Sequence, residues 1–420
     1  MDRQLLKKIL LNNQERIEKQ ELIVRDFTFD DFACYVLVGV RRSGKSFLLY
    51  QRMKTLLDNG KDWSDMLYLN FEDERLEGFS SDDFNSILEI HLELYGKKPI
   101  LFLDEIQNVN GWHKFARRIA DEKYISYITG SNAKMLSQEV MTTLGGRYIS
   151  KDVYPFSFKE YLTALHIPYD ELSLIKTNTK TQVINAFSEY FTNGGLPETL
   201  RLTEKRDYIS SVYQKIYLGD VIARNNIENI NGVKLLIKKI AESVMQPISY
   251  NRLQRILSSV GGRISLASII KYLDGILDSW LLFKIQNIAS SISEKETVCK
   301  YYFVDNGIFN LFFLENNTGL LENLVALTLV KKYGRESQVF YYNKGVEVDF
   351  YIPEEEQAIQ VSYSIKDFNT YEREVGALYK ISKALSCKKR TIITYDEEQT
   401  ISDKYGEIDV VPIWKYLLEA

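Results

Sequence analysis

The sequence has few of the residues that build disulfide scaffolds and metal centres. It contains three cysteines and three histidines in 420 residues. Cys34, Cys299 and Cys387 lie far apart and lack the spacing of a zinc site, which argues against a disulfide scaffold and indicates a reducing compartment. No two histidines form a metal-binding pair, so we interpret each histidine as structural.

Long apolar runs and targeting signals are also missing. No apolar run reaches the roughly 18 residues that are needed to span a bilayer. Residues 1–11 are too charged for a secretory signal, so we expect a cytoplasmic protein. The net charge of −4 does not mark the whole chain as a nucleic-acid binder, although it is compatible with a local basic face.

What the chain does contain is typical of a globular protein with two or three domains. Hydrophobic residues make up 45% and charged residues 26% of the sequence. Residues 1–22 are expected to form a helix, and residues 31–150 alternate apolar strands with amphipathic helices. Strands are expected at 34–38, 66–70, 100–103 and 125–129, and helices at 84–94 and 112–122. This alternation predicts an α/β fold with a doubly wound parallel sheet.

The most informative stretch follows the first expected strand. It reads Gly39-Val40-Arg41-Arg42-Ser43-Gly44-Lys45-Ser46, the G-x-x-x-x-G-K-S pattern of a phosphate-binding loop, or Walker A motif. Glycine allows the tight bend, successive backbone N–H groups point at the anion, and the helix that opens at Phe47 adds its dipole. We predict that residues 39–47 bind ATP, with Lys45 on the β- and γ-phosphates and the Ser46 hydroxyl on Mg²⁺. Arg41 and Arg42 are variable positions of the motif that could face solvent, a phosphate or a partner.

A second motif supplies the acids that such a loop needs. Residues 99–103 are apolar and precede Asp104 and Glu105, as in a Walker B strand. Side chains alternate along a strand, so the two carboxylates leave its end in different directions. Ligands of open α/β sheets lie at the carboxyl ends of the strands. We predict that Asp104 contacts Mg²⁺ through a water and that Glu105 activates the attacking water, the alternative being an exposed acidic turn.

Two further side chains are candidates for catalysis. Asn132, with Ser131 as second choice, follows the next strand and is expected to contact the γ-phosphate or to orient the water. A cap on the following helix is the alternative. Arg147 is expected to neutralise charge in the transition state, an effect of roughly 10³–10⁵ in rate where it occurs. A surface salt bridge is the alternative for Arg147, and the sequence leaves open whether it acts in its own subunit or in a neighbour.

The character of the chain changes after residue 156. Three compact helices at 235–245, 249–259 and 266–279, followed by a strand at 281–288, suggest a winged helix. A phosphate-contacting face there would use Arg252, Arg255, Arg263 and Lys271, although helices also carry such residues to stay soluble. From residue 301 the pattern is mixed α/β. The expected domains are therefore 1–155, 156–295 and 296–420.

Together these motifs resemble one family, the prokaryotic AAA+ superfamily ATPases that carry a C-terminal domain of unknown function. The resemblance rests on the phosphate loop, the Leu-Asp-Glu strand end, and residues 129–132, 146–147 and 154–158. It continues through residues 193–197, 217–221, 302–307, 321–325, 347–350 and 371–374. It implies ATP binding and hydrolysis, a winged-helix middle and a C-terminal module similar to restriction-endonuclease folds.

The C-terminal module departs from an active nuclease of that class, which needs acids on a metal and a lysine on the attacking water. Gln360 stands where an acid is expected, and Ser362 stands where the lysine is expected. Lys366 could reach back only if the strand ends early. The acids available are Glu322, Asp349 and Glu347. We therefore expect a catalytically inactive module, kept for packing or partner binding.

The sequence favours an ATP-hydrolysing switch or motor that acts on an unknown protein partner. The first alternative is a nucleic-acid-processing enzyme in which the ATPase drives a nuclease or binds DNA. The second is a nucleotide-dependent binding module with negligible turnover. The sequence does not distinguish a monomer from a ring.

Overall fold

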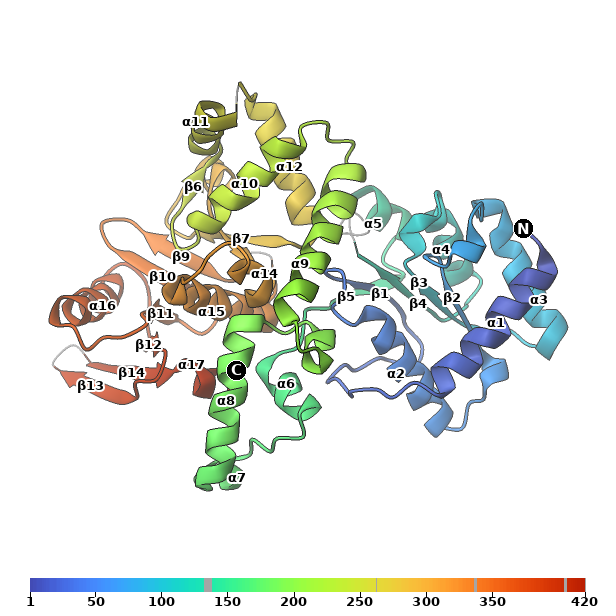
Figure 1. Cartoon of the computed structure of the whole chain (residues 1–420), viewed down its shortest axis with the longest axis horizontal. Helices are drawn as coiled ribbons and strands as arrows, with labels where there is room; N and C mark the ends of the chain where they lie inside the picture. The colour runs from blue at the N-terminus through green and yellow to red at the C-terminus, as the bar shows by residue number, and fades with distance from the viewer. Residues whose placement is uncertain (132–137, 262, 336–337, 404–405, 420) are drawn as a thin grey trace. The chain divides into compact units, whose positions relative to one another are not determined.

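The structure is a computed structural model that describes residues 1–131, 138–261, 263–335, 338–403 and 406–419. The chain divides into an N-terminal unit, Met1–Val153, and a C-terminal unit, Tyr154–Ala420. Figure 1 colours the N-terminal unit from blue to blue-green and the C-terminal unit from green to red. In the described part of the chain, no helix has both the length and the apolar composition that crossing a membrane requires.

The N-terminal unit alternates strands with helices, as its sequence predicts. Its strands are β1 (Cys34–Val38), β2 (Met66–Asn70), β3 (Ile100–Asp104), β4 (Ser126–Gly130) and β5 (Tyr148–Asp152). Its α-helices are α1 (Arg3–Glu18), α2 (Lys45–Asp58), α3 (Phe84–Tyr95), α4 (Trp112–Asp121) and α5 (Gln138–Leu144). The expected strands at 34–38 and 66–70 coincide with β1 and β2.

The strands of this unit form a parallel sheet in the order β2–β3–β4–β1–β5. Every residue of β1 and β4 is buried, as expected for central strands with both faces covered. Val38 pairs with Gly130 and Leu103 pairs with Ile128, so the carboxyl ends of β1, β4 and β3 lie side by side. The segments that follow these strands therefore meet at one edge of the sheet.

Aromatic rings on one face of the sheet anchor α2. The Tyr127 ring stacks on Tyr35 at 5.7 Å and on Phe102 at 4.9 Å between ring centroids. These rings share a buried cluster with Leu49 and Met53 of α2. Because β1 and α2 are both fixed by this packing, the loop that joins them has fixed ends.

The edge strand β5 is not expected from the sequence. Its residues after Tyr148 are exposed or only partly buried, so it lacks the apolar run that identifies a buried strand. β5 pairs with β1 from Cys34 opposite Tyr148 to Val38 opposite Asp152. The residue before it, Arg147, therefore lies near the amino edge of the sheet.

In the C-terminal unit helices come first and a mixed sheet follows. The α-helices are α6 (Phe158–Ala164), α7 (Glu171–Ile175), α8 (Thr177–Asn193), α9 (Lys205–Lys215), α10 (Ile230–Glu242), α11 (Tyr250–Gly261), α12 (Leu266–Asp278), α13 (Ile292–Thr297), α14 (Asn306–Asn310), α15 (Asn317–Tyr333), α16 (Phe368–Ile381) and α17 (Ile413–Glu419). The strands are β6 (Ile248–Ser249), β7 (Leu282–Asn287), β8 (Val298–Phe303), β9 (Phe340–Asn343), β10 (Glu347–Ile352), β11 (Gln357–Val361), β12 (Lys389–Thr394), β13 (Gln399–Asp403) and β14 (Gly406–Pro412). A π-helical segment, Ile216–Ala223, continues α9.

The sheet of the C-terminal unit runs in the order β13–β14–β12–β11–β10–β9–β7–β8–β6. Neighbours β11 and β12, β12 and β14, and β7 and β9 are parallel, and the other neighbours are antiparallel. α15 packs on β8 and β11, and α16 packs on β10 and β11. Residues from β8, β10, β11, α15 and α16 thereby come near one another.

A glycine turn locks the first helices of this unit to the sheet. The Gly195 N–H donates to Asp305 Oδ2 at 2.8 Å, and the Asn306 amide donates to the carbonyl oxygen of Phe191 at 3.0 Å. A Cβ on Gly195 would lie 2.3 Å from the carbonyl oxygen of Phe156. The turn that the sequence predicts at 193–197 therefore requires glycine at this close approach.

The three helices expected at 235–279 correspond to α10, α11 and α12, and β7 follows them. β7 pairs with β8 from Leu282 opposite Phe303 to Gln286 opposite Cys299, so the sheet continues across the division expected at residue 295. The separation of residues 156–295 and 296–420 into two domains stays a prediction. The unit boundary at 153 lies close to the one expected at 155.

Candidate nucleotide-binding site

The loop between β1 and α2 adopts backbone conformations that favour glycine. Gly44 has φ of +92°, and Arg42 is also left-handed, with φ of +65°. A Cβ on Gly39 would lie 2.0 Å from the carbonyl oxygen of Val153, so position 39 has no room for a side chain. The glycines of the motif therefore let residues 39–44 turn round the N-terminus of α2.

Lys45 is the first residue of α2 and is only 4% exposed. Its Nζ donates to the carbonyl oxygens of Gly39 and Val40, both at 3.0 Å. The same atom lies 3.8 Å from Oε1 of Glu105. The loop thus surrounds a buried ammonium, which is the charge that a polyphosphate would neutralise.

Asp104 ends β3 and is fully buried. Its Oδ1 accepts a hydrogen bond from the Thr129 hydroxyl, and its Oδ2 accepts one from the Tyr68 hydroxyl at 2.7 Å. Burial raises the pKa of Asp104, and the charge of Glu105 raises it further. The hydroxyls of Thr129, Ser46 and Tyr68 oppose this rise in pKa. These three hydroxyls use three of the roughly four lone-pair sites of the carboxylate, so Asp104 can still hold a cation beside Ser46.

Glu105 follows in a left-handed conformation, with φ of +51°. Its N–H donates to Thr129 Oγ1 at 2.9 Å, and its Oε2 accepts from the Gln107 amide at 2.5 Å. Burial works to raise the pKa of Glu105, but the Lys45 ammonium and the Gln107 amide outweigh it and hold the pKa below its ordinary value. An ionised carboxylate at this position can accept a proton from water. A strained backbone of this kind is often found at functional sites.

The polar atoms left over at this edge fit a phosphate ligand. Among the described residues, the Ser43 hydroxyl is buried without a hydrogen-bond partner, and the Ser131 hydroxyl is buried beside Glu105. Buried hydroxyls normally have a partner, so the Ser43 hydroxyl points to one that binds from outside the chain. Magnesium commonly takes one or two carboxylates together with phosphate oxygens, which suits Asp104 with Ser46. Residues 39–46 and Asp104 therefore fit ATP and Mg²⁺.

Of the two remaining catalytic candidates, the structure describes one, Arg147. Asn132 lies outside the described residues. Arg147 is not brought to the loop: its Nε donates to Asp121 at the end of α4, at 2.6 Å. Arg147 precedes Tyr148, which pairs with the first residue of β1, so it lies at the amino edge of the sheet. The phosphate loop follows the last residue of β1, and the 5 residues of this strand span about 16 Å at about 3.3 Å each. A role for Arg147 in its own site is thus not supported, and a role in a neighbouring subunit stays a prediction.

Comparisons with known proteins agree with this geometry. Residues 31–162 match the family described as "AAA domain", and residues 184–319 match "Domain of unknown function (DUF8612)". The chain is 33% identical over 429 residues to the uncharacterized protein MJ1544 of Methanocaldococcus jannaschii, a match that covers 99% of this chain and 95% of that protein. The chain belongs to this family of AAA-domain proteins. An uncharacterized protein of Haemophilus influenzae is 32% identical and covers 81% of this chain and 84% of its own length.

Solved structures add little to this family assignment. The Aeropyrum pernix ORC1 protein in complex with DNA matches with 13% identity and a TM-score of 0.29, over 67% of this chain and 86% of that one. A likeness at this level supports no conclusion about ligands or partners.

Several residues that organise the AAA domain have no role that the sequence motifs assign. Thr129 bonds both acids at the strand end, and Tyr68 on β2 bonds Asp104. Arg25 is buried and donates to the carbonyl oxygen of Ser43 at 2.9 Å. Its own backbone N–H and carbonyl group both bond the Gln51 amide. Thr129 and Tyr68 are polar side chains near the carboxyl ends of buried strands, and that position was the available signal.

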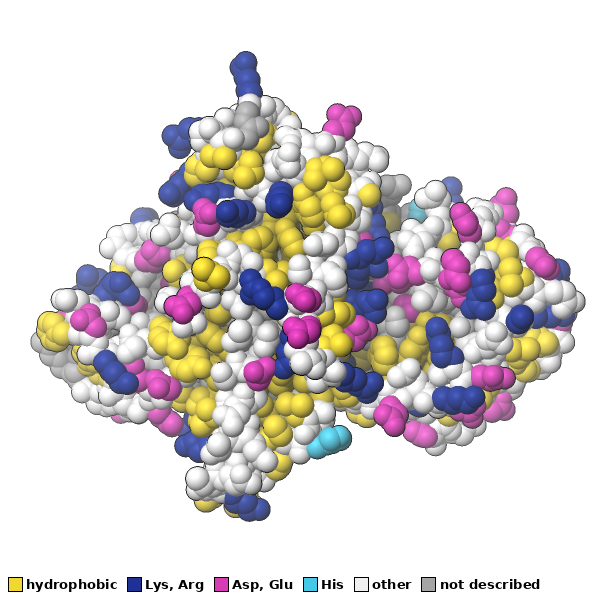
Figure 2. Space-filling view, viewed as in Figure 1, with side chains coloured by type: hydrophobic (Ala, Val, Ile, Leu, Met, Phe, Trp, Pro, Cys, Tyr) yellow, Lys and Arg dark blue, Asp and Glu magenta, His cyan; other side chains and the backbone are white. Residues whose placement is uncertain are grey.

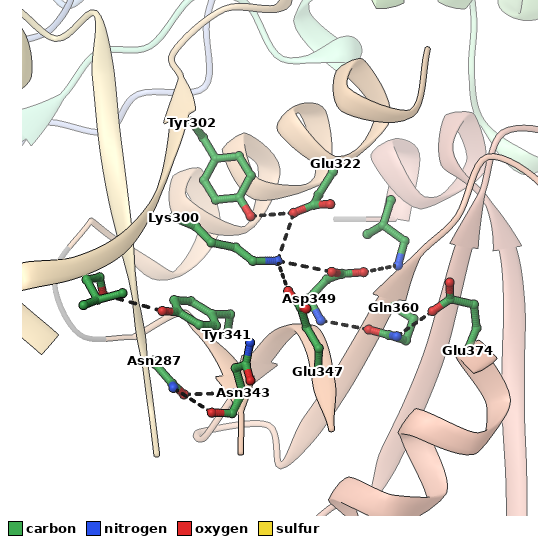
Figure 3. Close-up of polar contacts among 12 residues, drawn as sticks. Asn287, Lys300, Tyr302, Glu322, Tyr341, Asn343, Glu347, Asp349, Gln360 and Glu374 are labelled. Atoms are coloured by element: carbon green, nitrogen blue, oxygen red, sulfur yellow. Dashed lines mark hydrogen bonds and ion pairs between the residues drawn. The ribbon is translucent and has the colours of Figure 1, made fainter. Parts of the chain in front are cut away.

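The C-terminal unit of this family member brings together the acids that the sequence suggests. Glu322, Glu347 and Asp349 converge on one place, as Figure 3 shows. Ser362 donates to the carbonyl oxygen of Ser364 at 3.0 Å. Lys366, the remaining lysine candidate of the sequence, is exposed. The lysine that does reach the acids is Lys300 on β8, which the sequence motifs do not indicate.

Proposed function

We propose that the AAA domain binds ATP with Mg²⁺ and hydrolyses it, and that the chain uses this cycle as a switch or motor on a protein partner. The observation that carries the proposal is the meeting of Lys45, Asp104 and Glu105 at one edge of the parallel sheet. A phosphate loop alone would support binding. The buried acid pair beside it supports hydrolysis.

Each residue has a proposed role that follows from its position. Residues 39–47 hold the phosphates, and Ser46 with Asp104 holds Mg²⁺, which when bound neutralises phosphate charge. Glu105 is the proposed base, because Lys45 and Gln107 favour its ionised form. Asn132 and Arg147 remain proposed catalytic residues, with Arg147 acting from a neighbouring subunit.

The test compares ATP turnover and ATP binding in a pair of variants. Glu105→Gln is expected to keep ATP binding and to lose turnover by roughly 10²–10⁴-fold, the contribution typical of a general base. Lys45→Ala is expected to lose ATP binding measured by calorimetry with Mg²⁺ present. Glu122→Gln, an exposed change at the end of α4, serves as the matched control. Full turnover in Glu105→Gln would refute its role, and turnover absent from the unsubstituted protein would leave the binding-module alternative.

The finer fold assignments belong to the same proposal. We propose a P-loop NTPase fold for the N-terminal unit, a winged helix for α10–α12 with β7, and a restriction-endonuclease-like fold for residues 296–420. The mixed sheet with α15 and α16 packed on it supports the last assignment. Nuclease activity is not favoured, because Gln360 and Ser362 replace the acid and the lysine. Plasmid cleavage with Mg²⁺ or Mn²⁺ that Asp349→Ala abolishes would overturn this view.

A local basic face favours nucleic-acid contact as a second candidate function. Figure 2 shows basic side chains gathered over α10 and α11. The exposed basic residues of this region are Lys234, Lys238, Arg252, Arg255, Arg263 and Lys271. Binding of labelled duplex DNA, measured by anisotropy at several salt concentrations, tests it. If the face binds DNA, Arg252→Ala with Arg255→Ala should weaken binding and reduce the salt dependence.

A further inference from the structure

A fully buried lysine lies at the centre of the C-terminal unit. Lys300 is 0% exposed and projects from β8 toward α15 and β10. Its Nζ lies 3.3 Å from Glu322 Oε1, 3.2 Å from Glu347 Oε1 and 3.3 Å from Asp349 Oδ1. Figure 3 shows the ammonium between these carboxylates, which we call the acid cluster.

The strand periodicity explains how the acid cluster is assembled. Glu347 and Asp349 are two residues apart on β10, so they share one face of the sheet. Lys300 and Tyr302 are likewise two residues apart on β8. The Tyr302 hydroxyl donates to Glu322 Oε1 at 2.7 Å, on the same oxygen that faces the ammonium.

Gln360 is engaged in a way that only an amide permits. Its Oε1 accepts from the backbone N–H of Asp349 at 2.8 Å, and its Nε2 donates to Glu374 Oε2 at 2.5 Å. A carboxylate at this position would keep the first bond, but it would face Glu374 with no donor. Gln360 therefore serves the strand pairing and α16, and its oxygen is not directed at Lys300.

The place between the carboxylates of the acid cluster is taken by the Lys300 ammonium, whose nitrogen lies 3.2–3.3 Å from their oxygens, farther than metal–oxygen bonds. Oxygen ligands lie about 2.0–2.1 Å from Mg²⁺ and 2.3–2.6 Å from Ca²⁺. Among the described residues, no group of His, Cys, Asp and Glu side chains is arranged to hold a metal ion. The metal that a restriction-endonuclease-like fold implies therefore does not fit this centre as it stands.

We propose that the Lys300 ammonium takes the place of a divalent cation in the acid cluster, so that the C-terminal unit works without a metal. The carboxylates around Lys300 carry more negative charge than one ammonium neutralises. Removing the ammonium leaves the buried Glu322 and the partly buried Asp349 without a cation, which disfavours the folded state. A divalent ion would then relieve the repulsion, and the acid cluster would become a metal site.

Mn²⁺ binding to the full chain, followed by electron paramagnetic resonance without nucleotide, tests this inference. All variants carry Ser46→Ala, which weakens the separate metal site proposed in the AAA domain. The parent is expected to show no Mn²⁺ uptake that depends on Asp349. Adding Lys300→Met, a side chain of similar length without charge, is expected to create one Mn²⁺ site at least tenfold tighter than any in the parent. Adding Asp349→Asn to that variant is expected to remove the new site.

Two results would overturn the inference. The first is Mn²⁺ uptake by the parent that Asp349→Asn abolishes, because the metal and Lys300 would then coexist. The second is a folded Lys300→Met variant that gains no site. If Lys300→Met does not fold in metal-free buffer, recovery of folded protein with Mn²⁺ supports the inference, since a ligand of the native state stabilises it. Failure to fold with Mn²⁺ as well as without it refutes the inference.

Discussion

Replacing Thr129 by valine removes one hydroxyl from the end of β4 and keeps the shape of the side chain. In the structure this hydroxyl donates to Asp104 and accepts from the backbone N–H of Glu105. Thr129 is fully buried, so water cannot replace the lost partner. The substitution therefore disturbs the proposed metal ligand and the proposed base together, without touching either residue.

The size of the effect follows from these two bonds. A buried N–H left without a partner costs about 1–3 kcal/mol, and a hydrogen bond to a charged group contributes about 1.5–3 kcal/mol. Because both bonds use one hydroxyl, we expect a combined loss of roughly 2–3 kcal/mol. At roughly 2–4 °C per kcal/mol for a unit of this size, the Tm of the N-terminal unit should fall by about 4–12 °C. If the same free energy is lost from the transition state, turnover should fall roughly 30- to 150-fold.

The assay measures ATP turnover, ATP binding and thermal unfolding of Thr129→Val beside Thr129→Ser. Serine keeps the hydroxyl, so it should retain most of the activity and lose stability only through its missing methyl group. Turnover of Thr129→Val within twofold of the unsubstituted protein, with an unchanged Tm, would refute the reasoning. It would mean that the acid pair is oriented by other contacts, such as the Tyr68 bond to Asp104.

Three further predictions concern the C-terminal unit. Burial raises the pKa of Glu322 from 4.5 to about 7, so the folded state binds a proton that the unfolded state releases. The free energy of unfolding should therefore fall as pH rises from 4.5 through 7, by at most about 3 kcal/mol. Glu322→Gln should flatten this slope in urea unfolding measured at several pH values. Gln360→Glu places a second carboxylate against Glu374 and removes its donor, so the free energy of unfolding should drop by about 2–3 kcal/mol, and an unchanged urea midpoint would contradict the bridging role. Gly195→Ala puts a Cβ 2.3 Å from a backbone carbonyl oxygen and should lower stability by about 1–3 kcal/mol, whereas Gly376→Ala, whose Cβ would meet nothing within 4 Å, should not destabilise the protein.

The sequence predicts most of the N-terminal sheet because its central strands are continuous apolar runs. β1 and β2 lie where the apolar pattern indicates, and the loop motif fixes the position of α2. The sequence does not predict β5, because an edge strand exposes much of its length and lacks a continuous apolar run. It does not predict the pairing of β13 with β14 either, because β13 is also an edge strand and carries polar residues.

The candidate sites divide along a different line. Lys45, Asp104 and Glu105 are predictable because each belongs to a local motif. Lys300 is not, because it reaches the acid cluster from a strand that is distant in the sequence and not adjacent to β10 in the sheet. Arg147 is also beyond sequence reasoning, because which edge of the sheet it occupies depends on the unpredicted β5.

The bond between Gly195 and Asp305 constrains how the chain can be truncated. An expression fragment that ends at residue 295 would keep the turn and lose the carboxylate that holds it. It would also strip β6 and β7 of β8, their common partner. Recombination that exchanges only residues 154–295 or only residues 296–420 would place the same contacts between mismatched sequences. The C-terminal unit is therefore expected to be inherited and produced as a whole.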